Sequence, residues 1–419
     1  MKKLRLGVFG GIRGSEYYSA FLVNDFEIVA VCDKNPELLD LAKNRLGDGV
    51  ACYTDFEEFF NHPMDAVFLA NYFNEHAPYA IRFLDRGIHV LSECLPASTM
   101  AECVQLVRAA ERSSAVYMFA ENYPYMKFNR EMKKICEGGT LGKLLYAEGE
   151  YNHPLSGQDT GFILQRRWYP HHWRNYCPGT YYVTHSLGPL MISTGARPRR
   201  VSAFPVTNPP REEDAPYSSV CVTETAAMIT TLNDDGSVFR FTGCSSFGAH
   251  GNAYRICGEK GQMENLRGHG NTMMLRYNSW DIPEGAQEKK VYEPDWNHPK
   301  AELINREGHG GGDFFIAELF RDAILENKQP ELDVYVATLM SAVAILGHRS
   351  MLEEGVPYDL PDFRKEEDRV KWEKDTLTPF WGPNGEEPTL PAGAIRDYKP
   401  SPKQMENYSA LIATVTKPN

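Results

Sequence analysis

Apolar and polar residues follow two different patterns along the 419-residue chain, and the pattern changes after Tyr125. Up to that point, short apolar runs rich in β-forming residues alternate with segments of helical period. The expected strands are Leu4–Phe9, Glu27–Cys32, Val50–Tyr53, Ala66–Ala70, His89–Leu91 and Val116–Ala120, and the expected helices are Ser15–Val23, Asp55–Asn61, Ala77–Arg86 and Met100–Arg112. This alternation predicts an α/β domain with a doubly wound parallel sheet.

Longer β-type runs dominate after Tyr125. A helix over Phe128–Glu137 leads into them, and Asn233-Asp234-Asp235-Gly236 has the composition of a hairpin turn. The expected strands are Lys143–His153, Val201–Val206, Val220–Leu232, Val238–Ser245, Tyr254–Gly258 and Met273–Tyr277, followed by helices over Asp313–Asn327 and Val336–Glu353. Consecutive strands predict an α+β domain with an open, mainly antiparallel sheet. We expect a first domain over residues 1–123, a second over 124–365 and a C-terminal extension over 366–419 that packs on the surface.

The first 33 residues combine a strand, a glycine turn, a short helix and a second strand that ends in an acid. The turn is Gly10-Gly11-Ile12-Arg13-Gly14, and the acid is Asp33. Glycines let the backbone turn tightly and approach a pyrophosphate at a helix N-terminus, and a carboxylate about 20 residues later accepts ribose hydroxyls. This unit predicts an NAD site. Asp33 disfavours the 2′-phosphate of NADP, although the neighbouring Lys34 leaves NADP open.

The spacing of these glycines departs from the G-x-G-x-x-G pattern. One residue is missing if Gly10 is the first glycine, and the first position falls on Phe9 if Gly11 and Gly14 are the last two. A glycine turn in any parallel α/β protein is therefore the plain alternative to a dinucleotide site.

Composition narrows the class of partner. The net charge of −12 and the absence of a long Lys/Arg run argue against nucleic acid. No uninterrupted apolar stretch approaches the roughly 18 residues of a membrane span. Nine cysteines without C-x-x-C pairs predict reduced thiols in a cytoplasmic protein. The 22 tyrosines, 12 histidines and 6 tryptophans are mostly core candidates, but a sugar site would use the same rings.

Four short segments carry most of the candidate chemistry: Asn71–His76, Glu93–Pro96, Gly179–Pro189 and Gly308–Asp313. Within the third, Tyr182 and His185 are three residues apart, so on a helix or tight turn both side chains reach one point. A phenol and an imidazole together can pass a proton at neutral pH. The alternative is a buried, hydrogen-bonded histidine beside a packing tyrosine.

These segments resemble the Gfo/Idh/MocA oxidoreductase family over about residues 3 to 365, and within it the NAD-dependent glycosidase branch, glycoside hydrolase family 109. The segment Tyr182–Pro189 is similar to the branch's Y-P-T-H-G-L-G-P, and His309–Asp313 to its H-G-G-x-D. Further matches are Asp333-Val334-Tyr335 and Pro361-Asp362-Phe363. The resemblance implies an N-terminal Rossmann domain, a second α+β domain and NAD as cofactor. The open sheet of long strands separately predicts a homodimer or homotetramer.

One departure from the wider family shifts the expected reaction. Its dehydrogenases carry E-K-P after the fifth strand, with the lysine between nicotinamide and substrate hydroxyl. Here Glu93-Cys94-Leu95-Pro96 has Cys94 in place of that lysine, as the glycosidase branch also lacks it. The resemblance therefore implies a redox-assisted hydrolase or lyase more than a simple sugar dehydrogenase.

The motifs and the resemblance together assign roles to individual residues. His185, Tyr182 and His309 are the candidate catalytic groups. His309 stands before three glycines and a helix, so the alternative to a catalytic role is a position in a flexible loop. For His76, the alternative to a cofactor contact is helix capping. The cofactor candidates are Gly10, Gly11, Ile12, Arg13, Gly14, Asp33, Asn71, His76, Glu93, Cys94 and Asn122. The substrate candidates are Glu121, Tyr125, His153, Trp168, Trp173, Arg174 and Tyr181.

A metal site is a further alternative, because the chain contains His153, His171, His172, His185 and His309 together with Glu150. None of these residues has a tight ligand spacing, so we expect no metal. The expected function is hydrolysis of a glycosidic bond through transient oxidation at C3 of a carbohydrate glycoside. The alternatives are a sugar or polyol dehydrogenase that releases NADH, and a non-catalytic sugar or nucleotide sensor.

Overall fold

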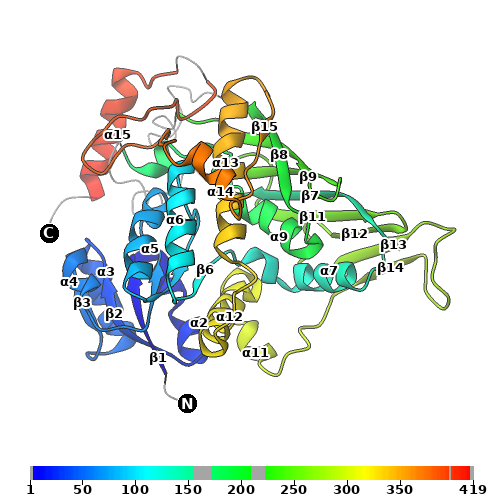
Figure 1. Cartoon of the computed structure of the whole chain (residues 1–419), viewed down its shortest axis with the longest axis horizontal. Coiled ribbons are helices and arrows are strands. Elements are labelled where there is room, and N and C mark those ends of the chain that lie inside the picture. Colours follow the sequence, from blue (N-terminus) through cyan, green and yellow to red (C-terminus); the bar gives the residue numbers. More distant parts are fainter. Residues whose placement is uncertain (1–2, 155–170, 209–221, 396–397, 416–419) are drawn as a thin grey trace.

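The computed structural model describes residues 3–154, 171–208, 222–395 and 398–415, and it contains two sheets with helices packed on and between them (Figure 1). The six strands of the first sheet run in the order β3-β2-β1-β4-β5-β6, and all pair in parallel. They are β1 (Leu4–Phe9), β2 (Phe26–Cys32), β3 (Ala51–Tyr53), β4 (Ala66–Leu69), β5 (His89–Ser92) and β6 (Tyr117–Phe119). The doubly wound sheet predicted from the sequence is confirmed.

Helices connect these strands, and their ends follow local capping chemistry. They are α1 (Gly11–Glu16), α2 (Tyr18–Val23), α3 (Pro36–Leu46), α4 (Phe56–Phe60), the 3-10 turn η1 (Phe73–Glu75), α5 (His76–Asp85) and α6 (Met100–Arg112). The first helix begins at Gly11, earlier than the expected Ser15, and Tyr17 separates it from α2. α6 begins with a capping box, in which Thr99 and Glu102 each accept a backbone N–H.

The second sheet has nine strands in the order β14-β13-β12-β11-β7-β10-β9-β8-β15. Among the described pairings, β10 with β7 is parallel and the others are antiparallel. The strands are β7 (Leu144–Asn152), β8 (Pro198–Val206), β9 (Ala226–Asn233), β10 (Val238–Ser245), β11 (Gly251–Gly258), β12 (Gly261–Asn265), β13 (Met273–Tyr277), β14 (Lys289–Tyr292) and β15 (Tyr358–Asp359). The open, mainly antiparallel sheet is thus confirmed, and Asn233–Gly236 forms the turn between β9 and β10.

Several of the remaining helices pack on this sheet or lie between the two sheets, whereas the C-terminal helix lies at the outer edge of the molecule (Figure 1). They are η2 (Tyr123–Tyr125), α7 (Lys127–Glu137), η3 (Trp173–Asn175), α9 (Thr184–Thr194), α11 (Ala301–Ile304), η4 (His309–Gly311), α12 (Gly312–Glu326), α13 (Val334–Leu352), α14 (Glu366–Trp372) and α15 (Pro402–Val415). Of these, α9 packs against β7 and β10, and α13 packs against β8. Figure 1 shows α13 between the first-sheet helices and the second sheet.

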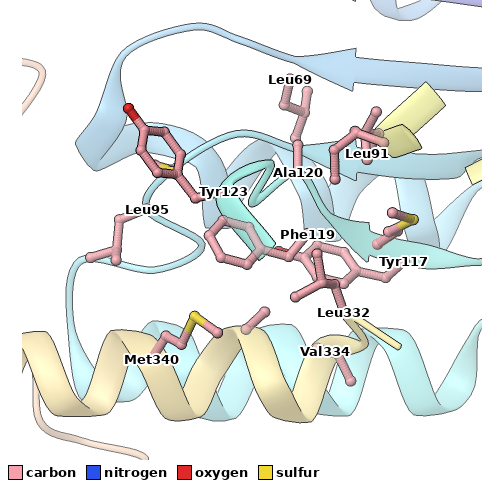
Figure 2. Close-up of a cluster of buried hydrophobic side chains, with 14 of the residues drawn as sticks. Leu69, Leu91, Leu95, Tyr117, Phe119, Ala120, Tyr123, Leu332, Val334 and Met340 are labelled. Atoms are coloured by element: carbon pink, nitrogen blue, oxygen red, sulfur yellow. The ribbon is translucent and has the colours of Figure 1, made fainter. Parts of the chain in front are cut away.

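Helix α13 is the apolar link between the two sheets. Figure 2 shows Val334 and Met340 of α13, and Leu332 just before this helix, packed with Phe119 at the end of β6 and Leu95 after β5. The backbone N–H of Phe119 donates to the carbonyl of Leu332 at 2.9 Å. α13 is the one described helix long and apolar enough to cross a membrane, yet 89% of its apolar window is buried inside the protein. Its apolar composition therefore fits a core helix.

The C-terminal part of the chain crosses the outer end of α13. The guanidinium of Arg349 donates to both carboxylate oxygens of Asp375, at 2.6 and 2.7 Å. The fully buried ring of His348 donates from Nε2 to the carbonyl of Pro391 at 2.8 Å, because a carbonyl oxygen can only accept. Burial lowers the pKa of His348 to about 4.

This shift makes a prediction about acid stability. The folded protein binds the His348 proton only near pH 4, whereas the unfolded chain binds it near 6.5. The contribution to the free energy of unfolding is therefore complete above pH 6.5 and is lost as the pH falls to about 4, by about 3 kcal/mol. Urea unfolding of the wild type and of His348→Gln across this range should show a shallower pH dependence in the variant. Equal slopes would contradict the assignment, and exposed His269→Gln is the matched control.

Candidate active site

The parallel sheet brings several predicted cofactor residues, and the predicted substrate residue Glu121, to one edge. Gly10 follows β1, Asp33 follows β2, Asn71 follows β4, Glu93 follows β5, and Glu121 follows β6. Because all six strands run in the same direction, these positions line the carboxyl edge, where ligands of such sheets bind.

Each glycine of the turn meets a different steric requirement, which accounts for their irregular spacing. Gly10 has φ 107°, and a Cβ there would lie 2.2 Å from the carbonyl oxygen of Ala70. A Cβ on Gly14 would lie 2.4 Å from Val8, so Gly14 lets α1 pack closely on β1. Gly11 opens α1 and donates its N–H to Asp33 at 2.6 Å. Gly10, Gly11 and Gly14 therefore provide the tight turn, the helix start and the close helix–strand packing, although their spacing differs from G-x-G-x-x-G.

The described residues at this edge fit a dinucleotide. Asp33 accepts one backbone N–H on each carboxylate oxygen, from Gly11 and from Asn35, and each oxygen keeps a lone pair for a ribose hydroxyl. The buried amide oxygen and nitrogen of Asn71 have no hydrogen-bond partner among the described residues. A buried amide without partners costs free energy unless a ligand pairs with it. Asn71 is therefore a ready donor and acceptor at the strand edge.

A first histidine–carboxylate pair lies beyond the end of β6. The Nδ1 of His185, the second residue of α9, lies 2.9 and 3.0 Å from the two carboxylate oxygens of Glu121. Burial raises the pKa of Glu121, but the charge and hydrogen bonds of His185, Thr184 and the Tyr123 N–H outweigh it and leave the pKa below its usual value. An ionised carboxylate only accepts, so Nδ1 carries the proton and Nε2 is the basic atom.

The motif around His185 explains how this ring is held. Pro189 lacks the N–H that would bond the carbonyl of His185 within α9, and the hydroxyl of Tyr254 donates to that carbonyl instead, at 2.5 Å. A Cβ on Gly188 would lie 2.8 Å from Cγ of Glu121, so glycine lets the helix approach the carboxylate. Glycine and proline of the segment therefore have identifiable structural roles.

A second histidine–carboxylate pair lies at the start of α12. The Nδ1 of His309 lies 2.9 and 3.1 Å from the carboxylate oxygens of Asp313, whose side chain is almost fully buried. Burial raises the pKa of Asp313, but hydrogen bonding from His309 and the positive charge of Arg13 lower it below its usual value. His309 thus also presents its Nε2 atom, and its ring is about one-third exposed.

Aromatic rings connect the two pairs. The ring of Tyr123 stacks on His185 with centroids 4.1 Å apart, and its centroid lies 6.0 Å from that of His309. Tyr151 and Tyr182 meet His185 edge-on at 5.0 and 5.2 Å. The predicted catalytic residues Tyr182, His185 and His309 therefore lie around one aromatic cluster.

Two rings of this cluster, Tyr123 and Tyr151, and the carboxylate Asp313 that holds His309 were not among the predicted site residues. Asp313 lies in the H-G-G-x-D segment, and its position four residues after His309 was the available signal. Tyr123 directly follows Glu121-Asn122, and Tyr151 lies two residues before His153, but tyrosines in such places are usually core.

Cys94 occupies a buried position between the two sheets. Its Sγ lies 3.2 Å from the hydroxyl of Thr184 and 3.6 Å from Glu121. Burial and the negative charge of Glu121 raise its pKa well above the usual value, so the thiol is neutral. Ligand atoms of Cys94, Glu121 and His185 lie within 4.8 Å of one another and are of types that bind zinc. These atoms already bond to one another, and the expectation of no metal stays a prediction.

The predicted residues His76, Trp173 and Arg174 lie outside the ring contacts of His185 and His309. His76 is buried at the start of α5, and its Nδ1 bonds the carbonyl of Leu95. Trp173 stacks on Phe73, which also stacks on Tyr182, and Arg174 lies over the Trp173 ring. Trp168 lies outside the described residues.

Three substrate candidates have partners of their own. His153 stacks on Tyr151, and its Nδ1 lies 2.9 Å from that of His250 at the exposed rim. Tyr125 bonds Glu331, and fully buried Tyr181 bonds the carbonyl of Ser98. The hydroxyls of Tyr125 and Tyr181 are therefore directed into packing contacts, whereas His153 stands next to the aromatic cluster.

Two family models match the chain and fit this geometry. Residues 4–121 match the oxidoreductase family with an NAD-binding Rossmann fold, and residues 224–373 match the C-terminal domain of glycosyl hydrolase 109. A glycosyl hydrolase family 109 protein of Shewanella pealeana is 27% identical over 405 residues, covering 87% of this chain and 86% of its own. One of Stenotrophomonas maltophilia is 23% identical, covering 86% and 89%.

Solved structures show the same fold. A levoglucosan dehydrogenase in complex with NADH and L-sorbose is 19% identical with a TM-score of 0.72, and the match covers 86% of this chain and all of that one. A myo-inositol 2-dehydrogenase of Lactobacillus plantarum is also 19% identical, with a TM-score of 0.65 and the same coverage.

The parallel sheet with its glycine turn, joined to a second domain in which α9 and η4 carry the two histidines, defines an NAD-binding enzyme of the sugar-acting class. More particularly, the chain joins a Gfo/Idh/MocA NAD-binding domain to a glycosyl hydrolase 109 C-terminal domain.

Proposed function

We propose that the protein hydrolyses glycosidic bonds of carbohydrate substrates through transient oxidation of the sugar, without net consumption of NAD. The observation that carries this proposal is the pair of histidines, each fixed at Nδ1 by a buried carboxylate, on one aromatic cluster. Elimination beside a carbonyl needs a base and an acid at separate points, and two such imidazoles supply both.

Bound NAD⁺ supplies a reversible acceptor for hydride from a ring carbon, which we assign to C3. Gly10, Gly11, Ile12, Arg13, Gly14 and Asp33 would hold its adenosine and phosphates, and Asn71, His76, Glu93, Cys94 and Asn122 the rest. The pairing of Asp33 with Gly11 and the unpartnered amide of Asn71 support this placement.

The chain's own residues would move the protons. Nε2 of His185, with Tyr182 beside it, removes the proton of the hydroxyl whose carbon is oxidised. The resulting ketone acidifies the hydrogen on C2. Nε2 of His185, after releasing the first proton to water, takes this hydrogen as a proton, and the aglycone leaves C1. His309 in its doubly protonated form keeps Nδ1–H on Asp313 and donates the proton on Nε2 to the leaving oxygen, after which water adds and the ketone is reduced again. This route differs from a pair of carboxylates around an oxocarbenium-like centre.

The neutral thiol of Cys94 supports a cycle without net oxidation. A lysine at this position would place a titratable amine between cofactor and sugar, whereas the buried thiol donates to Glu121 and shares a hydrogen bond with the hydroxyl of Thr184. The second candidate function remains a sugar or polyol dehydrogenase, favoured by the fold shared with levoglucosan dehydrogenase.

A panel of α- and β-glycosides tests the proposal. Released aglycone and NADH absorbance are followed together in the presence of NAD⁺. Aglycone release with constant NADH supports the proposal, stoichiometric NADH supports a dehydrogenase, and binding without either product supports a sensor. Intact aryl glycosides throughout the panel would overturn the glycosidase.

We further propose a cytoplasmic homodimer or homotetramer. The seven cysteines with described side chains are free thiols, in keeping with a reducing compartment. Exposed Phe204 and Leu232 on the open sheet are in keeping with association through that sheet.

A further inference from the structure

The carboxylate of Asp313 is the meeting point of three separate parts of the fold. It accepts from the side-chain amide of Asn122 at 2.6 Å and from Nδ1 of His309 at 2.9 Å. The guanidinium of Arg13, a residue of the glycine turn, lies 3.7 Å away. Asp313 thus touches the end of β6, the candidate acid and the turn expected to hold the phosphates.

The backbone around His309 is shaped to make this contact. His309, Gly310 and Gly311 have φ values of 51°, 60° and 90°, all in the left-handed region. A Cβ on Gly308 would lie 2.3 Å from the carboxylate of Asp313. A histidine in this backbone region is unfavourable by itself, so packing and the Asp313 contact must hold it there.

Arg13 is fixed by contacts with both domains. Its Nε donates to Glu93 at 2.7 Å, and its guanidinium lies over the ring of Tyr17 at 4.6 Å. The hydroxyl of Tyr17 in turn accepts from the amide of Asn122 at 3.4 Å. A change in charge at the glycine turn is therefore transmitted to Asp313 over less than 4 Å.

We propose that Asp313 is a positioning residue that holds the His309 ring with its proton on Nδ1, and that Arg13 links this pair electrostatically to the glycine turn. The titratable and charged groups facing the pair are Arg13 and Glu93 from the cofactor edge and Tyr17 and Tyr123 from the adjoining helical turns. The role as a proton donor rests on the proposed function, but the placement of the proton does not.

The test is ¹⁵N NMR of the protein labelled with ¹⁵N-histidine, with the His309 signals assigned by their loss in His309→Gln. Asp313→Asn should move the proton of the neutral His309 ring away from Nδ1, because a carboxylate that only accepts is replaced by an amide that can also donate. Arg13→Gln should raise the pKa of Asp313, followed by ¹³C NMR of its carboxyl group, because a nearby positive charge that lowers this pKa is removed. Asp322→Asn, a half-exposed carboxylate on the same helix, is the matched control.

An unchanged tautomer of the neutral His309 ring in Asp313→Asn would overturn the positioning role. An unchanged pKa of Asp313 in Arg13→Gln would overturn the link to the glycine turn. If Asp313→Asn fails to fold, the wild type still decides, since a neutral His309 ring with its proton on Nε2 instead of Nδ1 contradicts the proposal. Because these NMR measurements need no turnover, a failed glycosidase assay leaves their result independent. In an active enzyme, kcat of Asp313→Asn should fall about 100-fold with NAD still bound.

Discussion

His185→Ala is expected to lower glycoside turnover by at least about 1,000-fold while leaving NAD binding intact. A positioned general base contributes about 10² to 10⁴ in rate, and His185 combines the most enclosed position with the buried partner Glu121. The glycine turn and Asp33, which we expect to hold the adenosine and phosphates, lie at the edge of the first sheet and not on α9. Initial rates with the best glycoside of the panel, and calorimetric titration with NAD⁺, measure the two effects separately.

The matched control for this variant is His269→Ala, since His269 is exposed on a loop far along the second sheet. It should keep wild-type turnover and NAD affinity. Full activity in His185→Ala would refute the base. Loss of NAD binding together with turnover would show that His185 supports the fold of the cofactor site instead.

Gly10→Ala is expected to destabilise the protein by about 4 kcal/mol and to abolish NAD binding. Its φ of 107° is accessible to glycine alone, and the new Cβ would lie 2.2 Å from the backbone carbonyl of Ala70. Left-handed strain costs about 1 to 3 kcal/mol, and overpacking adds a similar amount. Because the neighbour is backbone, relief requires a shift of the strand edge that carries Asn71.

Gly139→Ala separates the two contributions. Gly139 also has a positive φ, 65°, but a Cβ there meets nothing within 4 Å. This variant should lose only about 1 kcal/mol, the cost of left-handed backbone. Urea unfolding of both variants gives the comparison. An equal, small loss in both would contradict the steric account of the glycine turn.

The parallel sheet could be predicted from sequence because buried parallel strands are almost continuously apolar. Leu4–Phe9 and Ala66–Leu69 are such runs, and Asp33 and Asn71 follow from where the strands end. Short or polar strands are harder to predict from the sequence. β12 and β14 are four to five residues long and rich in charge or glycine, so only pairing in the sheet defines them.

The candidate site also contains residues that the sequence predicts and residues that it does not. Tyr182, His185 and His309 could be proposed from the sequence because their segments carry glycine, proline and histidine at recognisable spacing. The buried partners could not be assigned, because Glu121 and His185 are 64 residues apart and meet only when α9 packs against the end of β6. Tyr125 and Tyr181 are predicted as substrate residues because they lie beside motifs. Their positions in the sequence do not indicate that their hydroxyls bond Glu331 and the carbonyl of Ser98 instead.

Hydrolysis in heavy water, with the released sugar examined by NMR at C2, tests the central claim most directly. Elimination beside a transient ketone removes the C2 hydrogen, and water returns a different one. The account predicts deuterium at C2 of every product molecule while NADH does not accumulate. Aglycone release with the original hydrogen retained at C2 would contradict transient oxidation and return the site to a direct displacement mechanism.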